Sequence, residues 1–223
     1  MRIACLHTAD SHIALFDATA RAVSPTLELT HEVRADLLAA AEQAGGLTEA
    51  IAMQTRASLL ALRSGSHAVL LTCSTLGPAV DDALAKQCAP VPVVRTDAAL
   101  AQRALAHGGK VVVLCTASTT LEPTASLFIE AAKGTAAEVD VRLISGAWDL
   151  FKEGALPAYF SAIAAAADAA YADGADVIAL AQASMTGAAE RVTRGAIPLT
   201  SPQSGLAAAM AAAALAAEAL EPK

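Results

Sequence analysis

The chain has 223 residues, of which 55% are hydrophobic and 17% charged, and this composition excludes an intrinsically disordered protein. Its formal net charge of −7 argues against nucleic acid or an anionic membrane surface as a partner. Met1–Leu6 enters a strand-like pattern with no cleavable leader, so we expect a cytoplasmic protein. The Ala-rich stretches Ser161–Ala172 and Leu206–Leu220 are interrupted by Asp168 and Glu218, and we interpret them as helices rather than membrane spans.

Short apolar runs alternate with helix-length segments along the whole chain. The predicted strands are Arg2–His7, Leu27–Thr30, Ala68–Thr72, Val91–Arg95, Lys110–Cys115, Val139–Ile144, Asp176–Ala181 and Ile197–Thr200. The predicted helices between them include Leu47–Arg63, Asp97–Ala106, Thr124–Lys133 and Tyr159–Ala172. This alternation predicts an α/β fold with parallel sheets, in which ligands bind outside the carboxyl ends of the strands.

Two segments of the chain resemble each other. Gly65–Leu76 aligns with Gly174–Met185: each opens with Gly, continues as an apolar strand and ends in polar residues, with Cys73 aligned to Gln182. Ala-rich sequences also produce such matches by chance. A true repeat predicts two pseudo-symmetric lobes, each a parallel sheet flanked by helices, with an active-site cleft between them. The first lobe would comprise residues 1–95 with 200–223, and the second residues 96–199.

Small polar residues follow four of the predicted strands. They are Thr8, Asp10 and Ser11; Thr72 to Thr75; Thr116, Ser118, Thr119 and Thr120; and Gln182 with Ser184. Hydroxyls and the free N–H groups of helix N-termini suit a carboxylate or a phosphate. A single Ser or Thr could simply cap a helix. Four clusters on one edge of the sheets favour a ligand site.

Cys73 is the candidate reactive residue, because a thiol directly before a helix start is expected to have a lowered pKa. We expect Cys5, Cys88 and Cys115 to be buried and unreactive. The four cysteines have no metal-type spacing, and a chain of this length needs no disulfide framework. No Ser/His/Asp order, phosphate-loop glycine motif or HExxH-type metal motif competes with Cys73.

Three short motifs together resemble the aspartate/glutamate racemase superfamily, which includes hydantoin and glutamate racemases, maleate isomerase and arylmalonate decarboxylase. The motifs are Leu71–Thr75, Cys115–Pro123 and Leu180–Met185. The resemblance implies a two-lobed α/β enzyme without metal or organic cofactor. It also implies chemistry at the α-carbon of a small carboxylate or amino-acid derivative.

In racemases of this superfamily, two cysteines act on opposite faces of the α-carbon, and backbone N–H groups with Ser/Thr hydroxyls hold the carboxylate. Cys73 falls on the first-lobe cysteine, and Gln182 stands in place of the second. The residues that fall on carboxylate-binding segments are Ser74, Thr75, Thr116, Ser118, Thr119 and Thr120. The strand-end residues Thr8, Ser11 and Ser184 complete the candidate substrate-binding set.

A carboxamide has no useful acid or base form near neutral pH, so Gln182 places two-base racemisation in doubt. His12 or His31, near early strand ends, could replace the lost thiol or could have ordinary structural roles. A one-base decarboxylase or isomerase stays open, although the single cysteine of arylmalonate decarboxylase corresponds to the second lobe. A binding protein for small carboxylates without turnover also stays open. The Ala-rich helices would suit a homo-oligomer.

Overall fold

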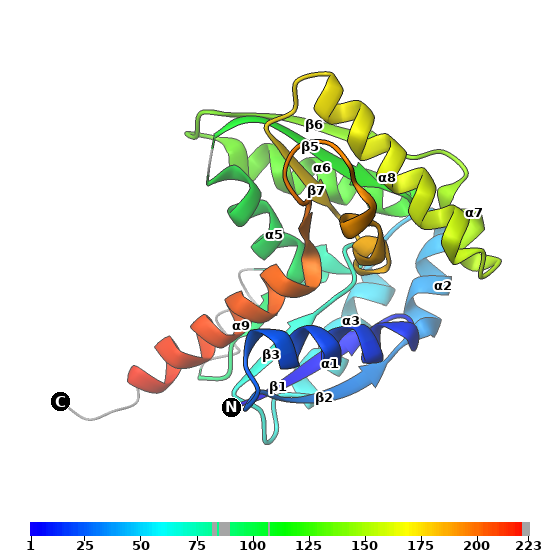
Figure 1. The fold of residues 1–223 in the computed structure, drawn as a ribbon. Coiled ribbons are helices and arrows are strands. Elements are labelled where there is room, and N and C mark those ends of the chain that lie inside the picture. Colours follow the sequence, from blue (N-terminus) through cyan, green and yellow to red (C-terminus); the bar gives the residue numbers. More distant parts are fainter. Residues whose placement is uncertain (82–83, 85–89, 107, 220–223) are drawn as a thin grey trace. The chain divides into compact units, whose positions relative to one another are not determined.

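The computed structural model describes residues 1–81, 84, 90–106 and 108–219. Its contacts divide the chain into two compact units. Unit 1 contains Met1–Ala99 and Pro202–Lys223, and unit 2 contains Leu100–Ser201. The chain passes from one unit to the other inside helix α5 (Thr96–Leu105) and again at the start of helix α9 (Ser201–Glu218) (Figure 1).

Unit 1 is built on a four-stranded parallel sheet with the order β2-β1-β3-β4. Its strands are β1 (Arg2–His7), β2 (Glu28–Val33), β3 (Ala68–Leu71) and β4 (Val93–Arg95). Its further helices are α1 (Ser11–Val23), α2 (Ala35–Ala44), α3 (Glu49–Ala61) and the short 3-10 helix η1 (Gly77–Ala79). Ala4 and Leu6 of β1 pack with apolar residues of α2 and α3. His7, which alternates with them, contacts Phe16 of α1. The sheet of unit 1 is therefore covered on both faces.

Unit 2 repeats this plan with the order β6-β5-β7-β8, again all parallel. Its strands are β5 (Gly109–Cys115), β6 (Ala137–Leu143), β7 (Val177–Leu180) and β8 (Leu199–Thr200). Its further helices are α6 (Ser118–Ala132), α7 (Ala147–Lys152), α8 (Leu156–Ala172) and the 3-10 helix η2 (Ala183–Arg191). The first strand of each unit pairs with the second and third, and the third pairs with the fourth. The predicted repeat is confirmed, with β3 and β7 as its equivalent strands.

Both faces of the unit 2 sheet are apolar because both carry helices. Val111, Val113 and Cys115 pack with residues of α5 and α6, whereas Val112 and Leu114 pack with α7 and α8. All five side chains have an exposed fraction of 0%. A continuous apolar run is typical of a parallel strand buried on both faces, so the predicted α/β class is confirmed.

The predicted elements differ from the observed ones mainly at their ends. β2 continues to Val33, three residues beyond the predicted end, because its pairing with β1 extends to His7. Helix α6 begins at Ser118 rather than Thr124, and it accommodates Pro123 near its start although proline removes a backbone donor. Within the described ranges, no helix combines the length and the apolar character that crossing a bilayer requires.

Candidate active site

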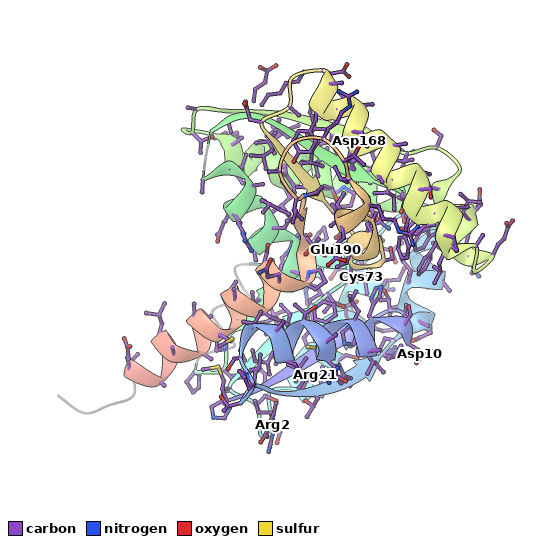
Figure 2. All side chains as sticks on the ribbon, viewed as in Figure 1. Arg2, Asp10, Arg21, Cys73, Asp168 and Glu190 are labelled. Atoms are coloured by element: carbon purple, nitrogen blue, oxygen red, sulfur yellow. The ribbon has the colours of Figure 1, made fainter. Side chains whose placement is uncertain are left out.

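In unit 1, Cys73 and Thr8 lie side by side just beyond the carboxyl ends of β3 and β1. The register pairs Leu6 with Leu71, so the residues two positions further along each strand become neighbours. The Thr8 hydroxyl hydrogen-bonds to the Cys73 sulfur. Thr8 is buried, while Cys73, which is labelled in Figure 2, is half-buried. This edge of the sheet therefore offers a partly accessible thiol held by a hydroxyl from the next strand.

The environment of Cys73 favours the neutral thiol. Burial raises the pKa of the Cys73 thiol, the hydrogen bonds from Thr8 and from the backbone N–H groups of Leu76 and Thr75 lower it by less, and the Asp97 carboxylate raises it. The expectation of a lowered pKa is wrong. The residues directly after Cys73 form a turn and the three-residue η1, not an α-helix whose dipole could stabilise a thiolate. The raised pKa favours the neutral form of the Cys73 side chain at neutral pH.

The turn after Cys73 rests on a buried ion pair. Arg95 donates to both carboxylate oxygens of Asp97, through Nε at 3.0 Å and Nη2 at 2.8 Å. A Cβ atom on Gly77 would lie 2.5 Å from Arg95 Nη2 and 2.7 Å from Asp97 Oδ2. A side chain at this position would require the ion pair or the turn to shift. The turn that follows Cys73 is thus in close contact with the ion pair.

The other predicted residues of unit 1 differ in accessibility. Ser74 and Thr75 are buried, with exposed fractions of 7% and 2%, whereas Ser11 at the start of α1 is exposed. Thr72, directly before Cys73, is turned into the sheet, where its hydroxyl donates to the Leu6 carbonyl oxygen at 3.0 Å. Cys73 and Ser11 are therefore the more accessible members of this set.

Three histidines gather on the face of the unit 1 sheet that α1 covers. His7 Nδ1 lies 2.9 Å from Thr72 Oγ1, His7 Nε2 lies 2.9 Å from His31 Nδ1, and His31 Nε2 lies 3.2 Å from Asp17 Oδ1. The pKa of His7 is lowered to about 3, mainly by burial and to a smaller extent by the neighbouring His12 and His31. Burial also lowers the pKa of His12 to about 4, which makes it a weak base near neutral pH.

The sequence singled out His12 and His31 but missed His7, which is the centre of this cluster. Its signal was available, because His7 follows the apolar run of β1 directly and a buried polar residue there needs a partner.

In unit 2, Gln182 and Thr116 occupy positions equivalent to those of Cys73 and Thr8. Leu114 pairs with Leu180, and the two residues lie two positions beyond that pair. The Gln182 Oε1 atom accepts from the Thr116 backbone N–H at 2.6 Å, from the Thr116 hydroxyl at 2.9 Å and from the Ala117 N–H at 3.1 Å. The carboxamide oxygen thus accepts hydrogen bonds from three donors just beyond the end of β5.

Tyr159 of α8 joins the same network. Its hydroxyl lies 3.1 Å from Thr116 Oγ1 and 2.8 Å from Ser184 Oγ. Because Thr116 donates to Gln182, a consistent order of donors runs from Ser184 through Tyr159 and Thr116 to the carboxamide oxygen. Tyr159 is fully buried, and the sequence analysis placed it only at the start of a predicted helix. Its position inside an Ala-rich helix, facing polar strand ends, is the signal that was missed.

The remaining predicted residues of unit 2 lie at the start of α6. Ser118 is exposed, Thr119 is half-buried and Thr120 is buried. Cys115 at the end of β5 has an exposed fraction of 0%, and burial raises its pKa to about 12. Cys5 is also fully buried, as expected, and Cys88 lies outside the described residues.

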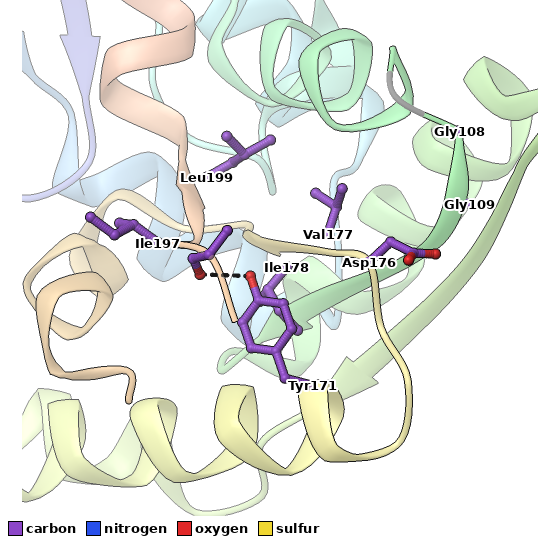
Figure 3. A pocket seen from close by; sticks show the side chains of 9 residues that line it. Gly108, Gly109, Tyr171, Asp176, Val177, Ile178, Ile197 and Leu199 are labelled. Atoms are coloured by element: carbon purple, nitrogen blue, oxygen red, sulfur yellow. Dashed lines mark hydrogen bonds between the residues drawn. The ribbon is translucent and has the colours of Figure 1, made fainter. Parts of the chain in front are cut away.

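A pocket of about 470 Å³ in unit 2 lies at the opposite ends of these strands (Figure 3). It is lined by Gly109, Asp176 and Val177 near the amino ends of β5 and β7, and by Tyr171 and Ile197, among others. Ligands of parallel sheets bind at the carboxyl ends, where Thr116 and Gln182 lie. This pocket therefore lies apart from the candidate active-site residues of unit 2.

Comparisons with known proteins agree with the fold and the order of these elements. The model of the Asp/Glu/Hydantoin racemase family matches residues 8–214. An aspartate racemase from Picrophilus torridus superposes with a TM-score of 0.72 at 12% identity, over 96% of this chain and 94% of that one. A search of curated proteins finds no match.

Two further solved structures have the same fold. A glutamate racemase from Thermus thermophilus, in complex with β-chloro-D-alanine, gives a TM-score of 0.63 at 19% identity, over 100% of this chain and 83% of that one. An allantoin racemase from Klebsiella pneumoniae gives a TM-score of 0.67 at 17% identity, over 96% of this chain and 88% of that one.

Proposed function

The chain belongs to the Asp/Glu/hydantoin racemase family, and on this premise we propose that it is a cofactor-independent enzyme acting at the α-carbon of a small carboxylate or amino-acid derivative. Cys73 is the residue that exchanges a proton with the substrate. The observation that carries the proposal is the half-buried sulfur at the carboxyl end of β3, hydrogen-bonded by Thr8. The family resemblance of the sequence implies a cysteine as the acid/base group for this step.

The raised pKa of Cys73 supports a role as proton donor. A neutral thiol can protonate a carbanion or enolate at the α-carbon, and the thiolate that results accepts a proton in the reverse direction. Hydrogen bonds from Thr8 and from the Leu76 and Thr75 N–H groups lower the cost of that thiolate. Ser74, Thr75, Ser118, Thr119 and Thr120 are proposed to bind the substrate carboxylate, together with Thr8, Ser11 and Ser184.

Gln182 is proposed to orient the substrate rather than to move protons. A carboxamide neither donates nor accepts a proton near neutral pH, and its Oε1 atom is occupied by Thr116 and Ala117. Thr116, assigned to carboxylate binding from the sequence, has its hydroxyl and N–H engaged in the same contacts. This favours one-sided chemistry, such as isomerisation or decarboxylation with protonation, over racemisation by two thiols.

The test is solvent exchange at the α-carbon. Aspartate, glutamate, hydantoins and arylmalonates are incubated with the protein in deuterated water, and deuterium incorporation and product configuration are followed by NMR and chiral chromatography. We expect Cys73-dependent deuteration on a single face. Binding of these compounds without exchange or reaction would favour a carboxylate-binding protein instead.

Gln182→Cys supplies the matched gain-of-function control. If the side chain at position 182 reaches the substrate, the added thiol provides a second acid/base group, and products of both configurations are expected from a substrate that the parent deuterates on one face. Gln182→Ser, which also removes the carboxamide but adds no thiol, should give no such gain. If the two variants give the same product configurations, the proposal that residue 182 contacts the substrate is contradicted.

A further inference from the structure

Cys5 lies beside two of the clustered histidines of unit 1, His7 and His31, and all three side chains can bind a metal ion. Cys5 and His7 lie two residues apart on β1, so their side chains point to the same face, and the register places His31 of β2 opposite Cys5. One ligand atom from each of the three lies within 4.8 Å of the others. Cys5 and His7 are fully buried, and His31 is half-buried.

The distances are close to those that a zinc ion requires. With Zn–N bonds of about 2.0 Å and Zn–S bonds of about 2.3 Å, tetrahedral ligand atoms lie roughly 3.3 to 3.6 Å apart. His7 Nε2 and His31 Nδ1 lie 2.9 Å apart, and the longest separation in the set is within 4.8 Å. Shifts of the order of one ångström would bring the three atoms onto one ion.

The hydrogen bonds at the outer nitrogens orient the two imidazoles toward each other. Thr72 donates its proton to the Leu6 carbonyl, so its oxygen accepts from His7 Nδ1–H. His31 Nε2–H donates to the Asp17 carboxylate. With protons on both outer nitrogens, the 2.9 Å separation of His7 Nε2 and His31 Nδ1 is that of a hydrogen bond with one proton between them, which a metal ion would displace. Metal-binding histidines are held in this way, by an acceptor on the outer nitrogen.

We propose that Cys5, His7 and His31 form a zinc site, with Thr72 and Asp17 as the groups that orient the two imidazoles and water as the fourth ligand. Thiolate and imidazole are ligands that suit Zn²⁺. Binding forms one Zn–S and two Zn–N bonds, breaks the Cys5 S–H bond and displaces the proton shared by His7 Nε2 and His31 Nδ1, and both protons pass to solvent. The ion joins β1 to β2 beneath α1, and its role is to stabilise unit 1 rather than to act on substrate.

A second observation in the same interior is a buried nitrogen of His12, Nδ1, that lacks a hydrogen-bond partner among the described residues. The ring centroid of His12 lies 6.0 Å from that of His7. Buried polar groups are nearly always paired, often with ordered water. A water molecule bound to the ion is one source of such a partner.

The test is cobalt uptake by the full chain, because Co²⁺ replaces Zn²⁺ and reports its ligands by absorption. The protein is stripped with a chelator and titrated with Co²⁺. We expect one equivalent per chain, the visible bands of a tetrahedral ion and a near-ultraviolet thiolate-to-cobalt band. Cys5→Ser should abolish the thiolate band, while Cys115→Ser, at an equally buried cysteine of unit 2, should keep it.

Variants of the histidines and of Asp17 separate coordination from folding. His31→Ala should weaken Co²⁺ binding by more than about 100-fold, and Asp17→Asn, which changes only an orienting group, by about 10- to 100-fold. His67→Ala, at an exposed histidine of unit 1, should bind as the parent does. Circular dichroism establishes that each variant is folded, and Asp17→Asn supplies the comparison if His31→Ala does not fold. Absence of uptake, or parental uptake by both Cys5→Ser and Asp17→Asn, overturns the proposal.

Discussion

The carboxyl ends of β3 and β7 hold equivalent positions in the two sheets, but a thiol follows β3 and a carboxamide follows β7. In unit 1, Thr8 donates to a sulfur that remains half-buried. In unit 2, Thr116 and Ala117 donate to the carboxamide oxygen of Gln182. The threonine is common to both units, and the residue that it binds differs. The topology therefore determines where a functional group lies, while the side chain at that position decides whether it can move a proton.

The largest expected effect is on the thiol side of this comparison. Cys73→Ser should lower the rate of α-deuteration by about 10²- to 10⁴-fold, the range that one acid/base group contributes. Cys115→Ser, in the other unit, should change the rate little. The measurement is the initial rate of deuterium incorporation on the best substrate. Equal losses in the two variants would mean that Cys73 has no special role.

On the carboxamide side the expected effect is on stability. Gln182→Ala leaves two N–H groups and one hydroxyl without their acceptor, and each buried unsatisfied group costs about 1–3 kcal/mol. We expect a loss of roughly 3 kcal/mol in the free energy of unfolding, measured in urea. Gln54→Ala, at an exposed position of unit 1, should change it by less than about 0.5 kcal/mol. If Gln182→Ala leaves the free energy of unfolding unchanged, water satisfies these donors.

A smaller effect is expected from the turn that follows Cys73. Gly77→Ala places a methyl group against Arg95 and Asp97 and should destabilise the protein by roughly 1–2 kcal/mol through overpacking. It should also alter the alkylation rate of Cys73, because the N–H groups of Thr75 and Leu76 would shift. Pro78→Ala, at the exposed neighbouring position, is the control. If both variants behave alike, the close contact does not fix the turn.

The sequence alone predicts most of the strands and the equivalence of the two units. Apolar runs such as Val111–Leu114 predict parallel strands buried on both faces, and the alignment of Gly65–Leu76 with Gly174–Met185 predicts the equivalence of β3 and β7. Both signals are local, because each depends on residues close together in the chain. The ends of β2 and α6 were less accessible, since strand pairing and the tolerance of Pro123 depend on neighbouring elements.

The contacts of the candidate site could not be predicted in the same way. Thr116 and Gln182 are 66 residues apart, and their hydrogen bonds depend on the register of β5 with β7. The pKa of Cys73 was predicted in the wrong direction, because it depends on burial and on the absence of an α-helix directly after the thiol. The position of His7 at the end of an apolar run was a usable signal, but its contacts with Thr72, directly after β3, and with His31 of β2 depend on the pairing of the strands.

The smallest expected effect concerns the pH dependence of the two thiols. Because burial raises the pKa of Cys73, its alkylation by iodoacetamide should keep rising with pH above the range where a free thiol levels off. Cys115, whose pKa is raised to about 12 and which is fully buried, should react only when the protein unfolds. Mass spectrometry of the labelled cysteines at several pH values measures both. Early labelling of Cys115 would contradict this contrast.

The central claim is that a proton is exchanged through Cys73 alone, from one face of the substrate. The most direct measurement is the configuration of the α-carbon after deuterium exchange, compared between the parent protein and Cys73→Ser. The account predicts exchange with a single configuration in the parent and its loss in the variant. Exchange with inversion in the parent, or undiminished exchange in Cys73→Ser, would contradict it.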